Sequence, residues 1–271
     1  MQIEKRRILV VRKMSALEYY YKNSHKSREL RESRKEQDKN IENLEKILQE
    51  KNQQYKIVTR KELDEKILRE YDFVFSAGGD GTAVATAAYN IATPQLNLKT
   101  DKKSKGLLCQ ENIEKATKSV LAGDYQIEKW TRQDVSLDNI FVGRALNETC
   151  VGEQLNFSKM AKYEIEFLEF EDIKREYHEN SGLIITTGTG STAWPFVFEP
   201  SSKKSEMFKF KTIFPTIGSE QGESDYFKII YKKHKGKFAL DTIEYKFPRD
   251  SMLEIKISRN PLLVAIPNYK K

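Results

Sequence analysis

The chain has 271 residues, 38% of them hydrophobic, and a formal net charge of +7, so it is long enough to form one large or two ordinary domains with apolar cores. No run approaches the roughly 18 apolar residues that a membrane-spanning helix requires, and the first residues follow neither a signal-peptide nor a transit-peptide pattern. We therefore expect an intracellular protein that does not interact with membranes.

The titratable residues do not form a metal-binding pattern. Cys109 and Cys150 are too few for a disulfide framework or a cysteine-based metal site, and the three histidines are scattered, so no metal ligands are predicted. The basic excess favours anionic partners, and nucleotides qualify as readily as nucleic acid. No nucleic-acid-binding motif accompanies the lysines of residues 228–237, which we expect on a solvated loop and sheet edge, so nucleic acid is not expected as a partner.

The first part of the chain alternates apolar runs with helical patterns. Residues 16–40 are polar and predicted to be partly helical. Strands are predicted at residues 7–11, 55–59, 73–75 and 94–98, and helices from residue 41 to about 52, at 61–70, 82–91 and 111–121. This alternation predicts an α/β domain with a parallel, Rossmann-like sheet, in which ligands bind at the carboxyl ends of the strands.

One glycine-rich segment follows the third predicted strand. Gly78-Gly79-Asp80-Gly81-Thr82, here called the GGDGT loop, leads into a run of small residues that predicts a helix. Glycines permit positive φ and remove Cβ atoms that would keep a phosphate from the backbone, while the start of a helix favours an anion. Phosphate would be repelled by Asp80, so this carboxylate is predicted to act as a general base or to contact nucleotide-bound magnesium. The alternative is an ordinary Gly-Asp-Gly turn.

Strand patterns replace helical ones beyond about residue 110. Extended segments are predicted at residues 127–142, with a turn at Asp138-Asn139, and at 161–170 and 182–186. Residues 238–247 and 252–258 are predicted to form a final antiparallel pair. We therefore expect an α/β domain at residues 1–110 and an all-β sandwich domain at 111–271, with the last residues packing back on the first domain.

Two polar segments in the second part follow apolar strands. Asn147-Glu148 offers an amide beside a carboxylate, which suits ribose hydroxyls, although a turn-forming Asn is the commoner explanation. Residues 186–193, Thr-Thr-Gly-Thr-Gly-Ser-Thr-Ala, carry five hydroxyls and two glycines, which suit contacts with ribose, phosphate or amide groups. The alternative there is a helix cap at Ser191 or Thr192.

The order of these motifs resembles the NAD kinase family, in particular its mitochondrial-type branch. GGDGT, then Arg144-Ala-Leu-Asn-Glu148, then residues 182–194 with TGTGS at 187–191, stand in the order of that family. Thr100-Asp101, Ser104-Lys-Gly106 and Trp130-Thr-Arg132 also match. GGDGT alone is shared with lipid kinases and phosphofructokinases. The resemblance runs from about residue 8 to residue 266 and is weak after residue 197.

The resemblance implies a role for each matching residue. Asp80 would take the proton of the adenosine-ribose 2′-hydroxyl of NAD, and Gly78, Gly79, Gly81 and Thr82 would hold the phosphates. The NAD-binding residues would be Asn147, Glu148, Thr189, Thr192 and Ala193. It further implies phosphoryl transfer from ATP, which brings its own Mg²⁺, to NAD, so the partners would be small-molecule nucleotides. A homodimer and a mitochondrial location are implied as well.

Some positions depart from the family pattern. Asn97 and Lys99 stand where Gly and Asn are usual, and Ser181 replaces an aspartate common in bacterial members. The Arg-Glu-Pro-Ile-like element expected after Trp194 has at best a blurred counterpart at residues 213–217. The departures after Trp194 keep open a catalytically silent nucleotide-binding homologue. The shared GGDGT motif keeps open a lipid kinase, against which the Asn-Glu and TGTGS segments speak.

Overall fold

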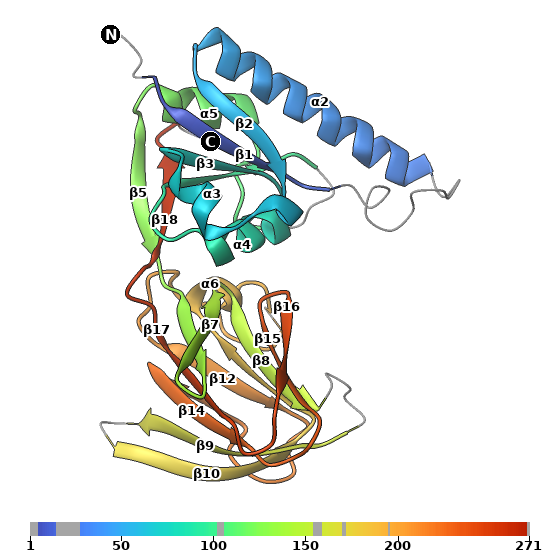
Figure 1. Cartoon of the computed structure of the whole chain (residues 1–271), viewed down its shortest axis with the longest axis vertical. Coiled ribbons are helices and arrows are strands. Elements are labelled where there is room, and N and C mark those ends of the chain that lie inside the picture. The colour runs from blue at the N-terminus through green and yellow to red at the C-terminus, as the bar shows by residue number, and fades with distance from the viewer. Residues whose placement is uncertain are drawn as a thin grey trace. The chain divides into compact units, whose positions relative to one another are not determined.

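The computed structural model describes residues 5–14, 28–101, 106–153, 159–169, 172–194 and 196–269. The chain forms two compact units (Figure 1). Unit 1 comprises residues 1–129 and 262–271, and unit 2 comprises residues 130–261. The predicted change from an α/β part to a β-rich part is therefore present, but the boundary between the units falls at 129/130 rather than at 110/111. It does so because the helix at 113–121 packs its apolar face into the core of unit 1.

Unit 1 is built on a six-stranded sheet with the order β2-β1-β3-β4-β18-β5. The strands are β1 (Arg7–Arg12), β2 (Gln54–Thr59), β3 (Phe73–Gly78), β4 (Gln95–Lys99), β5 (Tyr125–Trp130) and β18 (Leu262–Pro267). β1 pairs in parallel with β2 and β3, and β4 pairs in parallel with β3 and β18. Ile8 to Val11 are fully buried, as expected of a strand covered on both faces. The predicted parallel α/β domain is confirmed.

Helices and a short 3₁₀ turn supply the rest of unit 1. They are α2 (Arg28–Glu50), η1 (Arg60–Glu62), α3 (Glu65–Arg69), α4 (Asp80–Tyr89) and α5 (Ile113–Leu121). Apolar residues of α2 and α5 share one core with β1, β3 and β4, and Leu63 and Leu68 join a separate cluster with the other sides of β1 and β3. Residues 28–50 form one continuous helix, whereas residues 16–27 of the polar stretch lie outside the described residues.

The helix predicted at residues 61–70 is wrong in its extent. The chain forms the 3₁₀ turn η1 and then α3, because Asp64 is extended and its carboxylate accepts the N–H of Ile67 at 2.7 Å. Asp64 thus starts a new helix where the sequence pattern indicates one continuous segment.

Unit 2 is a sandwich of two six-stranded sheets, with the orders β10-β9-β14-β17-β6-β7 and β13-β12-β11-β8-β15-β16. The first sheet has β6 (Gln133–Leu137), β7 (Ile140–Ala145), β9 (Ala161–Glu169), β10 (Asp172–Asn180), β14 (Tyr226–Tyr231) and β17 (Met252–Ile257). The second has β8 (Glu148–Glu153), β11 (Gly182–Thr186), β12 (Phe208–Ile213), β13 (Gln221–Ser224), β15 (Gly236–Leu240) and β16 (Ile243–Phe247). Every described pair is antiparallel. Inward-facing residues of both sheets form one core, and the predicted all-β sandwich is confirmed.

Two pairings differ from those expected. Residues 238–247 do not pair with 252–258: β15 and β16 form a hairpin with each other, and β17 pairs with β14 and β6. The cause is the turn at Asp241, which adopts a left-handed φ of 51° and reverses the chain inside the predicted strand. The predicted turn at Asp138-Asn139, both at positive φ, does join β6 to β7, but β5 belongs to the sheet of unit 1.

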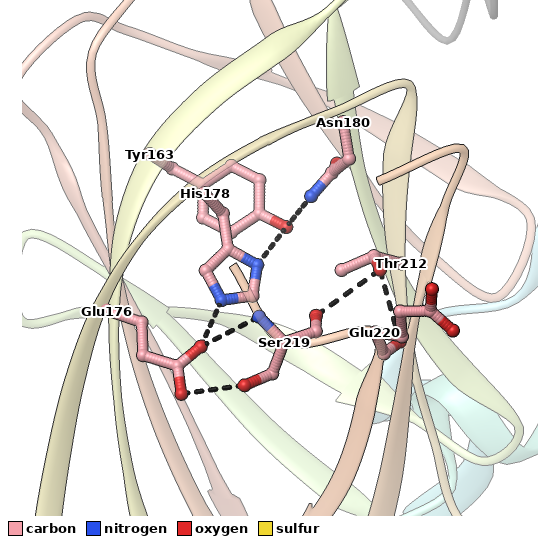
Figure 2. A network of polar contacts seen from close by, with 7 residues as sticks. All are labelled: Tyr163, Glu176, His178, Asn180, Thr212, Ser219 and Glu220. Carbon is pink, nitrogen blue, oxygen red and sulfur yellow. Dashed lines mark hydrogen bonds and ion pairs between the residues drawn. The ribbon is translucent and has the colours of Figure 1, made fainter. Parts of the chain in front are cut away.

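A polar cluster replaces apolar side chains at the β10 edge of the sandwich (Figure 2). His178 is fully buried and stacks on Tyr163. Its Nε2 lies 2.8 Å from the carboxylate of Glu176, which also accepts the hydroxyl and backbone N–H of Ser219. Asn180 donates to the Tyr163 hydroxyl at 2.6 Å. These contacts fasten the β12–β13 connection to β10.

Candidate functional site

The GGDGT loop joins β3 to α4 in unit 1. Gly79 is the residue before the helix and is extended (φ −156°, ψ −170°), so α4 begins at Asp80 rather than at Thr82 as predicted. None of the three loop glycines has a positive φ, so the left-handed conformation that glycine permits is not used in this loop. What these glycines contribute is the absence of a side chain.

Gly78 and Gly81 show this in different ways. A Cβ on Gly78 would lie 2.3 Å from the Thr82 hydroxyl and 2.9 Å from Lys13 Cβ, so the glycine permits close packing within the protein. A Cβ on Gly81 would meet no atom of the described residues within 4 Å, and Gly81 is exposed. Packing among those residues leaves space at position 81, and a glycine there lets a ligand approach the backbone.

The carboxylate of Asp80 is held by a later segment of unit 1. Its Oδ1 accepts the backbone N–H of Leu108 at 3.1 Å. A Cβ on Gly106 would lie 1.9–2.2 Å from the carboxylate atoms, so a larger residue at that position would displace the Asp80 carboxylate. The family match at residues 104–106 includes Gly106, although Ser104 and Lys105 lie outside the described residues. No pattern in the sequence indicated that Gly106 and Leu108 lie against Asp80.

A second connection fixes the loop from its other side. Thr100 donates its backbone N–H to the carbonyl of Gly78 at 2.8 Å. The neighbouring carboxylate, Asp101, is buried and accepts hydrogen bonds from Ser33 (2.8 Å) and Gln37 (3.2 Å) of α2. Thus the residues after β4 connect the GGDGT loop to α2.

In unit 2, the second and third motifs lie against each other. The turn Leu146–Glu148, here called the Asn-Glu turn, leads into β8 at Glu148. The TGTGS segment follows β11, which pairs with β8. Thr187 donates its N–H to the Asn147 carbonyl at 2.8 Å and its hydroxyl to the Leu146 carbonyl at 2.6 Å. A Cβ on Gly190 would lie 2.3 Å from the Asn147 carbonyl oxygen, so a glycine is needed for this contact.

The short helix α6 (Gly188–Ser191) has a different cap from the one considered from sequence. Its N-cap is Thr187, whose hydroxyl accepts the N–H of Gly190 at 3.2 Å, and not Ser191 or Thr192. Thr192 is partly buried at the end of α6 and Ala193 is exposed. The helix begins directly after Thr187, because Thr187 forms hydrogen bonds both with the Asn-Glu turn and with the first turn of the helix.

Among the described residues, three buried oxygens of this pair of loops have no hydrogen-bond partner: Asn147 Oδ1, Glu148 Oε2 and Thr189 Oγ1. Buried polar atoms in folded proteins are nearly always hydrogen-bonded, so three such atoms on two adjoining loops indicate a place for a polar ligand. All three belong to residues that the motifs singled out.

The electrostatics of the Asn-Glu turn are unusual. Burial and the negative charge of Asp241 raise the pKa of Glu148 to about 7, and the indole N–H of Trp194 acts against this by donating to the carboxylate. Glu148 and Trp194 both line a cavity of about 300 Å³, whose apolar wall includes Cys150, Ile184 and Ala239. Neither Trp194 nor Asp241 was identified as a functional residue from the sequence.

No group of three or more His, Cys, Asp or Glu side chains suited to a metal occurs among the described residues. In the same part of the chain, no helix combines the length and the apolar character needed to cross a bilayer.

The sequence is similar to curated NAD kinases. It is 28% identical over 206 residues to "NAD kinase 2, mitochondrial" of Rattus norvegicus, covering 58% of this chain and 48% of that protein. The human protein of the same name gives 28% identity over 206 residues, with 58% and 46% covered. The NAD kinase of Chlorobium phaeobacteroides (strain BS1) gives 28% over 156 residues, with 53% and 51% covered. The chain thus spans about half the length of the curated relatives it matches.

Solved structures share the fold over nearly the whole chain. An NAD kinase from Archaeoglobus fulgidus in complex with ATP superposes with a TM-score of 0.69 at 20% identity, covering 95% of this chain and 92% of that one. Yeast NADH kinase complexed with NADH gives a TM-score of 0.71 at 15% identity, with 97% and 84% covered. No family model matches the chain. In sequence the chain is thus similar to these curated NAD kinases, and it shares the fold of the two solved structures.

Proposed function

We propose that the chain is an ATP-dependent NAD kinase that transfers the γ-phosphoryl group of MgATP to the adenosine-ribose 2′-hydroxyl of NAD, forming NADP and ADP. The observation that carries the proposal is the set of unpartnered buried oxygens on Asn147, Glu148 and Thr189. Kinase and nucleotide names among the relatives, and solved relatives holding ATP or NADH, support it.

In the proposed reaction, unit 1 supplies the phosphate-binding residues and the general base. Asp80 accepts the proton of the ribose 2′-hydroxyl as its oxygen forms a bond to the γ-phosphorus, and the bond from that phosphorus to the β–γ bridging oxygen breaks. Gly78, Gly79, Gly81 and Thr82 hold the phosphates. Because phosphoryl transfer depends mainly on positioning and charge neutralisation, the bond from Leu108 to Asp80 serves to orient the base.

Unit 2 supplies the residues proposed to bind the dinucleotide. The free oxygens of Asn147, Glu148 and Thr189 accept hydrogen bonds from NAD hydroxyl or amide groups, and Thr192 and Ala193 extend the same loop. A Glu148 side chain with a pKa of about 7 carries a proton in part of the molecules at neutral pH, so it can donate as well as accept.

The decisive experiment measures NADP formation by the purified full chain with NAD, ATP and Mg²⁺. Asp80→Asn keeps the size of the side chain but removes the base, so kcat is expected to fall by about 10²–10⁴-fold, the usual size of a general-base contribution. Asp64→Asn is the matched control in unit 1, because Asn also caps the start of α3. A folded wild-type chain that forms no NADP would refute the proposal.

The divergent segment at residues 213–217 favours a second candidate, a homologue that binds nucleotides without turnover. Binding of NAD by calorimetry in the absence of NADP formation would distinguish this candidate from the kinase.

We also propose that the chain belongs to the mitochondrial-type branch, acts in mitochondria and forms a homodimer. Support for the branch and the location comes from relatives named mitochondrial; the dimer is proposed from family resemblance. Imaging of the tagged protein in its own cells and light scattering of the purified chain test these points. A cytosolic signal or a monomeric mass would count against them.

A further inference from the structure

The hairpin turn between β15 and β16 brings one carboxylate to the Asn-Glu turn. Asp241 occupies this turn with a φ of 51°, a conformation that Asp and Asn tolerate better than most residues. Its backbone N–H donates to the carbonyl of Glu148 at 2.9 Å, which continues the β15–β8 ladder beyond the pair Leu240–Thr149. The backbone of the β15–β16 hairpin is therefore held in a fixed register beside the Asn-Glu turn.

The Asp241 side chain accepts three consecutive backbone N–H groups. Oδ2 accepts from Leu146 at 2.9 Å, and Oδ1 accepts from Asn147 at 2.8 Å and Glu148 at 3.1 Å. Hydrogen bonds to an ionised acceptor are roughly twice as strong as neutral ones, so one side chain fixes the whole turn.

This arrangement decides what Asn147 and Glu148 can do. Asn in a turn commonly bonds a nearby backbone N–H with its own side chain. Here Asp241 occupies those donors, and the side-chain oxygens Asn147 Oδ1 and Glu148 Oε2 remain without a partner. A residue from 94 positions further along the chain thus leaves the motif side chains available to a ligand.

The arrangement has an electrostatic cost. Desolvation raises the pKa of Asp241 to about 6, against the three N–H bonds and the attraction of Arg132. Burial raises the pKa values of Glu148 and Cys150, and the charge of Asp241 adds to both shifts. A turn that served only stability would be satisfied by a neutral acceptor, whereas two carboxylates this close destabilise each other.

We propose that Asp241 is a positioning residue for the dinucleotide: it holds the Asn-Glu turn so that the side chains of Asn147 and Glu148 are free to bind NAD. The inference rests on the proposed function, since NAD is the ligand assumed. Asp241 acts through the turn, so its loss changes the binding of NAD and leaves the phosphate-binding residues of unit 1 unaltered.

The first test is Asp241→Asn in the full chain, with NAD and ATP affinities measured separately by calorimetry. Asn retains the size of the side chain and tolerates the left-handed turn, but its amide nitrogen faces a backbone N–H and loses at least one of the three bonds. The dissociation constant for NAD is expected to rise about 10–100-fold, as for an unsatisfied buried donor, while that for ATP stays unchanged.

A second readout separates positioning from a merely structural role. In the wild type the pKa of Glu148 is about 7, so NAD affinity is expected to change with pH around that value. Removing the negative charge of Asp241 favours ionised Glu148, so the midpoint should move to lower pH. The other groups facing the pair, Arg132, Cys150, Trp194 and Glu244, are the same in both proteins.

Two further variants make the test decisive. Asp241→Gly favours the left-handed turn and removes the carboxylate, so it should reproduce the loss of NAD affinity even if Asp241→Asn folds poorly. Asp250→Asn is the matched control, because Asp250 is an exposed residue at positive φ (61°) in the β16–β17 turn. The NAD affinity of this variant should equal that of the wild type.

The outcomes are distinguishable. Wild-type NAD affinity and an unmoved pH midpoint in both Asp241 variants would overturn the positioning role alone. Binding of NAD and ATP by the wild type without NADP formation would overturn the proposed kinase reaction and leave the positioning role standing. A wild-type chain that binds no NAD would overturn both.

Discussion

At the residue scale, the important side chains are oriented by backbone groups distant in sequence. Asp80 is held by Leu108, 28 residues away, and the Asn-Glu turn is held by Asp241, more than 90 residues away. In both cases a carboxylate accepts backbone N–H groups. A motif of five or two residues therefore identifies the candidate site residues but not the groups that hold them, because those contacts form only when the chain is folded.

Gly106 offers a test of the contact with Asp80. Gly106→Ala would place a methyl group about 2 Å from the Asp80 carboxylate and displace it from the Leu108 N–H. Since misplacement of a catalytic group by about 1 Å can cost 10²-fold, kcat for NADP formation should fall by about that factor with KM for NAD and ATP nearly unchanged. Steady-state kinetics measure this.

Leu107→Ala is the control for that substitution, since Leu107 lies in the same segment with 75% of its surface exposed. It should retain wild-type kcat. Wild-type kcat in Gly106→Ala would mean that the segment does not orient the base.

At the element scale, each motif lies at the end of a strand, and the position of that strand in its sheet decides where the motif lies. The GGDGT loop follows the carboxyl end of β3, and the Asn-Glu turn and TGTGS segment lie at the ends of the antiparallel pair β8 and β11. Parallel strands covered by helices depend on the helix faces for burial. The long helix α2 provides much of this, through Leu44, Ile47 and Leu48.

Leu44→Ala tests the contribution of α2. Leu44 is fully buried, so the free energy of opening of unit 1 should fall by about 2–5 kcal/mol from lost burial and the cavity left behind. Native-state hydrogen exchange of the β1 and β3 amides measures this locally. Asn43→Ala, on the exposed side of α2, should change it little; equal effects of the two would show that α2 is not packed as described.

At the scale of the whole molecule, the chain leaves unit 1 at residue 129 and returns to it at residue 262. The returning strand β18 lies in the interior of the sheet, between β4 and β5. Unit 1 therefore cannot complete its sheet until all of unit 2 has been synthesised, whereas unit 2 is continuous in sequence.

A chain ending at residue 260 should keep unit 2 folded and lose stability in unit 1. Burial of Leu262 and Val264 alone is worth about 3–6 kcal/mol at 1.5–3 kcal/mol for each side chain, and β4 would become an unpaired edge. Hydrogen exchange should show lost protection in β3 and β4 and retained protection in β8 and β11. Full protection of β3 and β4 would contradict the central place of β18.

The sequence by itself determined what depends on neighbouring residues: the strand–GGDGT–helix unit, the hairpin at Asp138-Asn139, the change from helical to strand patterns, and the order of three motifs typical of NAD kinases. Hydrophobic period and turn chemistry act over a few residues, so they can be read locally. Only the tertiary structure decided that β18 returns to unit 1, that residues 238–247 form their own hairpin, and that Leu108 and Asp241 form hydrogen bonds with the motif residues. Those features depend on strand order and on which distant backbone N–H groups bond to a buried carboxylate. Neither can be predicted from the residues next to it in the sequence.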